Sequence, residues 1–155
     1  MSIYQSQEEI ELLVQGFIGK TLPKEQWTHH AHLTTAIWHL KNYDVDEATC
    51  LLKSGIISYN LSVGSINNGS GGYHETLTIF WITVVDCFVR HHSHLNLTDT
   101  CNAFLQSNLA DRALPFLFYI KENVLSKAAR AKYMQADKME LTDENMGKLL
   151  MQVVA

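Results

Sequence analysis

The chain has little proline, few glycines and no long apolar run. Two prolines and eight glycines in 155 residues leave little to interrupt long helices. No stretch approaches the roughly 18–20 consecutive apolar residues of a membrane-spanning helix, so we expect no membrane partner. Hydrophobic residues make up 46% and charged residues 18%, which argues against disorder. A length of 155 residues fits a single domain over 1–155.

An excess of basic charge is also missing. The formal net charge is −4, whereas a nucleic-acid binder needs a basic face, so we expect no nucleic-acid partner. The first ten residues show neither a basic n-region nor an apolar h-region, so we expect no secretory signal. Cys50, Cys87 and Cys101 are an odd number at no motif spacing, which is typical of reduced thiols. Together these features predict a cytoplasmic protein.

Helical periodicity dominates the first part of the chain. A capping-box pattern starts at Ser6, and the apolar residues that follow at helical spacing predict a helix to about Lys20. Thr28 is expected to cap a second helix. A third helix is expected over 45–61, although Gly55 weakens its middle.

In the middle of the chain, a segment rich in glycine, serine and asparagine is followed directly by the most apolar segment. Glycine, serine and asparagine are concentrated between Val63 and Gly72, and predict a shaped loop inside the domain. The residues that follow predict a helix over 73–91 that is apolar nearly all round. Such a helix belongs at the centre of a bundle.

Shorter helices are predicted toward the C-terminus. Thr98 is expected to cap one through Gln106, Pro115 opens one to Glu122, Ser126 caps one over 127–133, and an amphipathic helix follows Thr142. The sequence thus predicts an all-α single-domain helical bundle of about six or seven helices, four of them long. A Gly-rich loop precedes its central apolar helix.

Four residues form the candidate site. His29 and His32 are three residues apart in the first turn of a helix, so both imidazoles share one face. His74 and Glu75 begin the most apolar helix. If the two helix starts meet, His29, His32 and His74 converge as ligands of one divalent metal ion, as in other helical bundles.

The metal and the role of Glu75 stay open at this stage. Three protein ligands plus water are typical of catalytic zinc, two histidines plus a carboxylate suit non-haem iron, and nickel is a third candidate. Glu75 would be a ligand, a general base on metal-bound water, or the acceptor that orients an imidazole. The N-termini of the two helices carry positive potential, which disfavours a metal cation between them. The same potential favours an anionic ligand bound beside the metal.

Other conspicuous residues are interpreted as structural. Asp86 is expected to pair with Arg90 one turn on, and Cys87 to be an inert core thiol. The three tryptophans are expected in the core, and most remaining histidines in packing, in solvent or at a solvated helix end. These residues are Trp27, Trp38, Trp81, His30, His39, His91, His92 and His94.

Two sequence blocks resemble a family of small uncharacterised bacterial proteins. The family carries an aromatic-x-His-x-x-His block, here residues 27–32, and a Tyr-His-Glu-Thr-Leu/Ile-Thr block, here residues 73–78. Its third block, Leu-x-Ser-x-x-Ala-Arg, is similar to the stretch from Tyr119 through Arg130. Where the family continues with Phe-x-x-Pro-Asp, this chain has Tyr133 and Ala136-Asp137 instead. The likeness covers about residues 10–140.

The resemblance implies one site but no established activity. It supports His29, His32, His74 and Glu75 as one group. It adds Tyr73, Tyr119, Ser126 and Arg130 as substrate-binding residues. A looser likeness is to DinB-like metal-binding helical bundles, whose usual histidine spacing is not reproduced here.

The leading hypothesis is a metal-binding helical protein with a small-molecule pocket, and the chemistry expected of it is that of a metal-dependent hydrolase. The loop up to Gly72 would border the pocket, and Arg130 would bind an anionic group of the ligand. An alternative keeps the His/Glu cluster as a metal-free ligand pocket. A further alternative is a scaffold or homodimer with Phe116–Tyr119 as its exposed surface.

Overall fold

Helices dominate the chain, as predicted. The structure is a computed structural model that describes residues 2–152. Within that range it holds nine α-helices, two 3₁₀ helices and no strand, which confirms the all-α bundle. The elements are α1 (Gln7–Ile18), η1 (Lys24–Gln26), α2 (His29–Asn42), α3 (Val45–Ser62), α4 (Glu75–His91), α5 (Leu97–Leu105), η2 (Asn108–Ala110), α6 (Pro115–Phe118), α7 (Lys121–Val124), α8 (Lys127–Ala131) and α9 (Asp143–Leu150).

Most helix starts follow from their capping residues. Side-chain oxygens of four residues accept the backbone N–H three residues on, at 2.9–3.2 Å, and so satisfy one free donor each. These residues are Thr28, Asp44, Ser126 and Thr142. Two starts differ from the prediction: Ser6 makes no side-chain cap, and α5 is capped by Asn96 rather than Thr98.

The helix predicted from Pro115 to Glu122 is wrong. Two short helices, α6 and α7, stand there, and Tyr119 between them is extended. The Tyr119 ring is fully buried near Phe80, and its hydroxyl donates to the carbonyl oxygen of Met134 at 2.8 Å. Burial of this one side chain explains why the helix is interrupted, since tertiary packing overrides local propensity.

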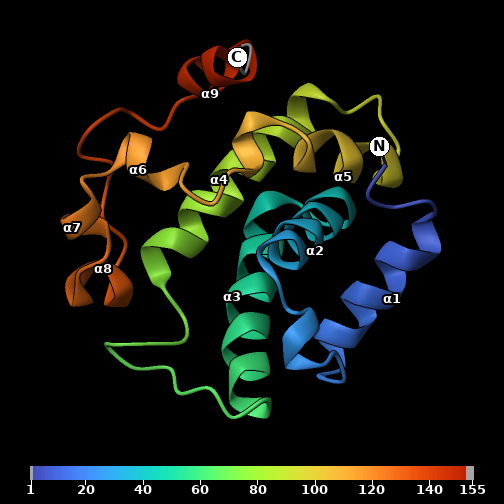
Figure 1. Cartoon of the computed structure of the whole chain (residues 1–155), viewed down its shortest axis with the longest axis horizontal. Helices are drawn as coiled ribbons and strands as arrows, with labels where there is room; N and C mark the ends of the chain where they lie inside the picture. The colour runs from blue at the N-terminus through green and yellow to red at the C-terminus, as the bar shows by residue number, and fades with distance from the viewer. Residues whose placement is uncertain (1, 153–155) are drawn as a thin grey trace.

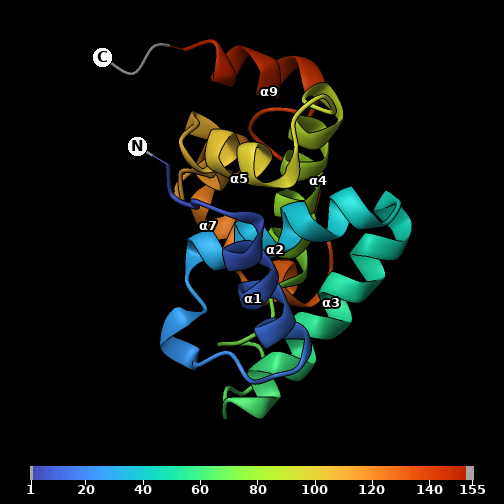
Figure 2. The same cartoon turned by 90° about the vertical axis from the view of Figure 1, so that its right-hand side faces the viewer.

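Helix α4 lies at the centre of the bundle, as its apolar surface predicts. It packs against α2, α3, α5, α8 and α9. Figure 1 shows it crossing the middle of the molecule, with α1 on one side and α6–α8 on the other, and Figure 2 shows α9 across one end of the bundle. Phe80, Val84 and Val85 of α4 are fully buried in a hydrophobic cluster that reaches from α1 to α9.

Helix α3 is continuous through Gly55, where the sequence suggested weakness. A Cβ at Gly55 would lie 2.9 Å from the Phe17 ring of α1. Glycine therefore lets α1 approach α3 closely, and this packing offsets its low helix propensity.

The Gly-rich loop between α3 and α4 has a defined shape. Gly72 adopts a φ of +74°, and a Cβ there would lie 2.6 Å from the side-chain oxygen of Asn67. That same oxygen accepts the backbone N–H of Tyr73 at 2.9 Å. The loop therefore positions Tyr73 and His74 directly before α4. No helix in the described part of the chain is both long and apolar enough to cross a bilayer.

Candidate functional site

A cavity of about 340 Å³ lies between α2, α3 and α4. Each helix contributes residues one or two turns apart, so that one face of each points inward. The lining residues are Trp27, His29, His32, Leu33, Ala36, Leu52, Ile56, Asn60, Gly72, Tyr73, His74, Leu77, Thr78, Trp81 and Ile82. The volume is in the range of small-molecule sites, and the lining is mainly apolar and aromatic with a few polar groups.

All three predicted histidines, and Tyr73, line this cavity. The structure therefore joins the two distant sequence blocks, because α2 packs directly on α4. A larger hollow of about 540 Å³ lies between η2 and α9, and none of the predicted site residues lines it. The cavity between α2, α3 and α4 is therefore the candidate functional site.

The ring of His29 is held by the backbone of a distant segment. Its Nε2 lies 2.9 Å from the carbonyl oxygen of Ala110, to which it donates as the Nε2–H tautomer. The ring also packs edge-on against Trp81 at 5.0 Å. Burial lowers the pKa of His29, although the Ala110 carbonyl acts in the opposite direction. His29 is thus a neutral imidazole with only Nδ1 uncommitted.

His74 uses both of its ring nitrogens. Nδ1 accepts the backbone N–H of Leu77 at 3.1 Å, so His74 is the N-cap of α4. Nε2 donates to the carbonyl oxygen of Val124 at 2.9 Å, and the residue is only 8% exposed. Burial lowers its pKa, which keeps the ring neutral as both bonds require. To bind a metal ion, His74 would have to give up one of these bonds.

His32 is the histidine most available to a ligand. Its ring packs edge-on against Trp27 at 4.0 Å and is accessible from the cavity. The protein around it nevertheless disfavours a positive charge. The His32 side chain is exposed to solvent, but the protein atoms packed around its ring, assisted by His29 and Arg112, lower the pKa of His32 from 6.5 to about 4. At neutral pH the cavity therefore presents an uncharged imidazole.

The three imidazoles share a cavity wall but not a common point. Among residues 2–152, only Cys87, His91 and Asp143 form a group of three whose ligand atoms lie within 4.8 Å of one another. The bonds of His29 to Ala110 and of His74 to Val124 turn Nε2 of both rings toward the backbone. The expected zinc, iron or nickel site stays a prediction.

Glu75 lies beside the cavity rather than on its lining. One carboxylate oxygen accepts from Lys53 of α3 at 2.5 Å, and the other from the Tyr73 hydroxyl at 2.6 Å. Partial burial raises the pKa of Glu75, but the Lys53 and Tyr73 bonds together lower it below its usual range. Burial and Glu75 raise the pKa of the Tyr73 phenol. Each carboxylate oxygen thus accepts one bond, and these bonds hold α4, α3 and the loop together, while the role of Glu75 as general base stays a prediction.

Arg130 lies at a separate, smaller hollow of about 240 Å³. Its guanidinium donates to the carbonyl oxygens of Gly72 at 3.0 Å and Tyr73 at 3.4 Å. Tyr73 lines both hollows and so lies between them. Arg130 therefore supports the loop that closes the cavity, and it does not line the cavity itself.

Tyr119 and Ser126, expected as substrate-binding residues, do not line the cavity. Tyr119 is buried in the core and is absent from the lining of the cavity. Ser126 accepts the N–H of Ala129 at 3.1 Å as the cap of α8, and its hydroxyl donates to the carbonyl oxygen of Asn123. Both hold structure together and do not reach a ligand in the cavity.

The stretch Phe116–Tyr119, expected as the exposed surface of a homodimer, is mostly buried, while the homodimer itself stays a prediction. Phe118 and Tyr119 are fully buried, and Phe116 packs partly against the core. Leu117 alone of the four is exposed. These aromatics form part of the bundle interior, so this stretch offers little apolar surface to a second chain.

Sequence reasoning missed several residues of the site. Trp27 and Trp81 were expected in the core but line the cavity, whereas Trp38 is a core residue as expected. The face of α3 made by Leu52, Ile56 and Asn60 was not assigned to the site. Leu52, Ile56 and Asn60 are spaced four residues apart, and this spacing indicates that they share one face of the helix.

The remaining interpretations are largely supported. Asp86 pairs with Arg90 at 2.9 Å, His30 is exposed and His39 is buried. Cys87 is buried, but its thiol also hydrogen-bonds Asp143, which the sequence could not indicate.

No protein-family model, curated protein or solved structure is detectably similar to this chain. The resemblance to a small bacterial family therefore stays a prediction. Any function must be inferred from the geometry above.

Proposed function

We propose that the chain binds a small, largely apolar molecule in the cavity between α2, α3 and α4 without help from a metal ion. The observation that carries this proposal is the lining: aromatic and aliphatic side chains on most sides, with a few polar groups in fixed positions. The bound molecule would lie against Trp27 and Trp81, whose rings offer large apolar surfaces.

The polar groups of the cavity define the polar end of this ligand. His32 presents a neutral imidazole, and Asn60 and Thr78 add an amide and a hydroxyl. An uncharged imidazole donates one hydrogen bond through one ring nitrogen and accepts one through the other, but it attracts no anion strongly. We therefore infer a ligand with a neutral polar group, such as a carbonyl or a hydroxyl, rather than the anionic ligand expected from the sequence.

Binding of N-phenyl-1-naphthylamine, an uncharged fluorescent probe of apolar cavities, tests the proposal. Thr78→Phe places a ring in the cavity and should abolish most of the probe fluorescence. Thr83→Phe is the matched control, because Thr83 is on the same helix but away from the lining. Thr78→Val removes the hydroxyl without filling the space and should weaken binding less. Equal fluorescence of wild type and Thr78→Phe would contradict the proposal.

A metal-dependent role of His29, His32 and His74, including hydrolysis, is the second candidate. It is favoured by one observation, the presence of all three rings on one wall. Metal content of the untagged protein, compared with His29→Ala, His32→Ala and His74→Ala, tests it. Unchanged metal stoichiometry in all three variants would eliminate it.

The cellular environment of the protein is also a proposal. We propose a reducing cytoplasmic environment, supported by the free state of Cys50, Cys87 and Cys101.

A further inference from the structure

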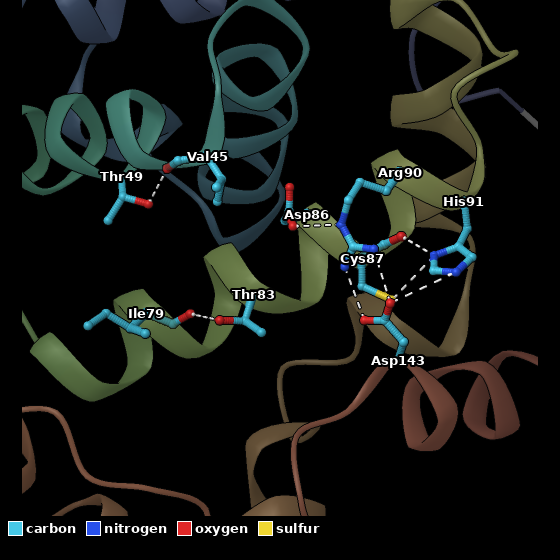
Figure 3. A network of polar contacts seen from close by, with 9 residues as sticks. All are labelled: Val45, Thr49, Ile79, Thr83, Asp86, Cys87, Arg90, His91 and Asp143. Atoms are coloured by element: carbon cyan, nitrogen blue, oxygen red, sulfur yellow. Dashed lines mark hydrogen bonds and ion pairs between the residues drawn. The ribbon is translucent and has the colours of Figure 1, made fainter.

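A second group of polar side chains lies toward the other end of α4, and none of its members lines the cavity. Cys87 and His91 are one turn apart in the last part of this helix, and Asp143 is the first residue of α9. One ligand atom from each lies within 4.8 Å of the other two. Figure 3 shows the thiol, the imidazole and the carboxylate turned toward one another. These are three common ligand types for zinc-class ions.

The imidazole of His91 is oriented as a metal ligand requires. Its Nδ1 donates to the carbonyl oxygen of Cys87 at 2.8 Å, which fixes the ring and the tautomer. Nε2 remains uncommitted and lies 4.0 Å from a carboxylate oxygen of Asp143. His74, by contrast, has both nitrogens engaged.

The carboxylate of Asp143 is also held in place. Arg90 donates to its two oxygens at 3.0 Å each, and a further N–H of Arg90 donates to Asp86 at 2.9 Å. Each carboxylate oxygen retains a second lone pair for another partner. Arg90 adds a positive charge that opposes a cation, but Asp86 offsets it, and the C-terminal end of α4 carries a negative partial charge.

The thiol of Cys87 is buried and protonated when no ion is present. Burial, together with the neighbouring Asp143, raises its pKa to about 11. A bound divalent ion reverses this preference, because it binds the thiolate and releases the proton to solvent.

We propose that Cys87, His91 and Asp143 bind one zinc-class divalent ion, with water as the fourth ligand. Metal–ligand distances of about 2.0–2.3 Å place tetrahedral ligand atoms about 3.3–3.8 Å apart. The present separations of up to 4.8 Å would therefore shorten by about 1 Å or a little more, within the range of side-chain rotation. The ion would join the end of α4 to the start of α9. The site is independent of the cavity and of its ligand.

Titration of the untagged, reduced full-length protein with Co²⁺ tests the assignment. A cobalt–thiolate bond produces charge-transfer absorption in the near ultraviolet, and we expect it to saturate at one equivalent. Cys87→Ser should lose this band. Cys50→Ser is the matched control and should retain it, because Cys50 is an exposed thiol on α3. Absence of the band in wild type, or its loss in Cys50→Ser alone, would overturn the proposal.

Two further variants keep the proposal testable if Cys87→Ser does not fold. Asp143→Asn changes an exposed residue, and we expect cobalt affinity to fall by at least about tenfold, since even residues behind the ligands contribute that much. Arg90→Gln removes the same ion pair but no ligand, and should retain the charge-transfer band. Unchanged affinity in Asp143→Asn would refute the site.

Discussion

The two ends of α4 carry histidines in opposite situations. At its start, His74 uses one ring nitrogen to cap the helix and the other to bind Val124. At its end, His91 commits one nitrogen to a carbonyl oxygen and keeps the other free, beside a thiol and a carboxylate. A histidine is available to a metal ion only where a ring nitrogen is free. By this criterion His91 is available at one end of α4 and His74 is not at the other, whereas, within the described residues, His29 keeps Nδ1 free and His32 keeps both ring nitrogens free.

The largest expected effect concerns the structural role of His74. His74→Ala removes a helix cap and leaves the buried Val124 carbonyl oxygen without its donor. We expect a loss of about 2–4 kcal/mol in the free energy of unfolding, measured with urea. His30→Ala, at an exposed position on α2, is the control and should change stability by less than about 0.5 kcal/mol. A similar loss of stability in both variants would show that the two hydrogen bonds of His74 are not the reason for its effect, and would contradict its role at the start of α4.

Tyr119 tests whether the core and the cavity are separate. Tyr119→Phe removes the hydroxyl bond to the carbonyl oxygen of Met134, and should cost about 1–2 kcal/mol of stability. Binding of N-phenyl-1-naphthylamine should stay unchanged, because Tyr119 does not line the cavity. Weaker probe binding with unchanged stability would indicate instead that Tyr119 takes part in ligand binding.

A smaller, pH-dependent effect is expected from His32. Its pKa is about 4 in the folded protein against 6.5 for a free imidazole, so protons bind the unfolded chain more readily. The neutral imidazole therefore costs no stability above pH 6.5, and stability falls as the pH drops from 6.5 toward 4. His32→Gln should flatten this fall in urea midpoints. Identical pH profiles of variant and wild type would show that the His32 ring is freely hydrated.

The smallest expected effect concerns the ion pair at the start of α4. Lys53→Gln removes the partner of Glu75, but both side chains are partly exposed. We expect a loss of less than about 1 kcal/mol, read from the urea midpoint. A much larger loss would mean that the pair, rather than the His74 cap, fixes the start of α4.

Local features of the sequence predict much of the fold. Thr28, Asp44, Ser126 and Thr142 begin helices where their types and positions indicate, and the apolar surface of α4 predicts its central place. These features depend on residues within one or two turns, which a single sequence displays directly. Tyr119 was misassigned because its position is set by packing onto α4, not by its neighbours.

The candidate site is only partly visible in the sequence. The spacing of His29 and His32, and the block around His74, correctly place these rings around one hollow. The use of their nitrogens was not predictable, because the carbonyl oxygens that bind them belong to Ala110 and Val124, 81 and 50 residues away. Asp143 is likewise brought to Cys87 only by the docking of α9 on α4.

The most direct test of this account is an imidazole nitrogen–proton correlation spectrum, recorded by NMR before and after addition of one equivalent of zinc. We expect Nε2–H tautomers for His29 and His74 in both spectra, and a zinc-induced shift at Nε2 of His91. Zinc-induced shifts at the ring nitrogens of His29, His32 and His74, with His91 unmoved, would contradict the account.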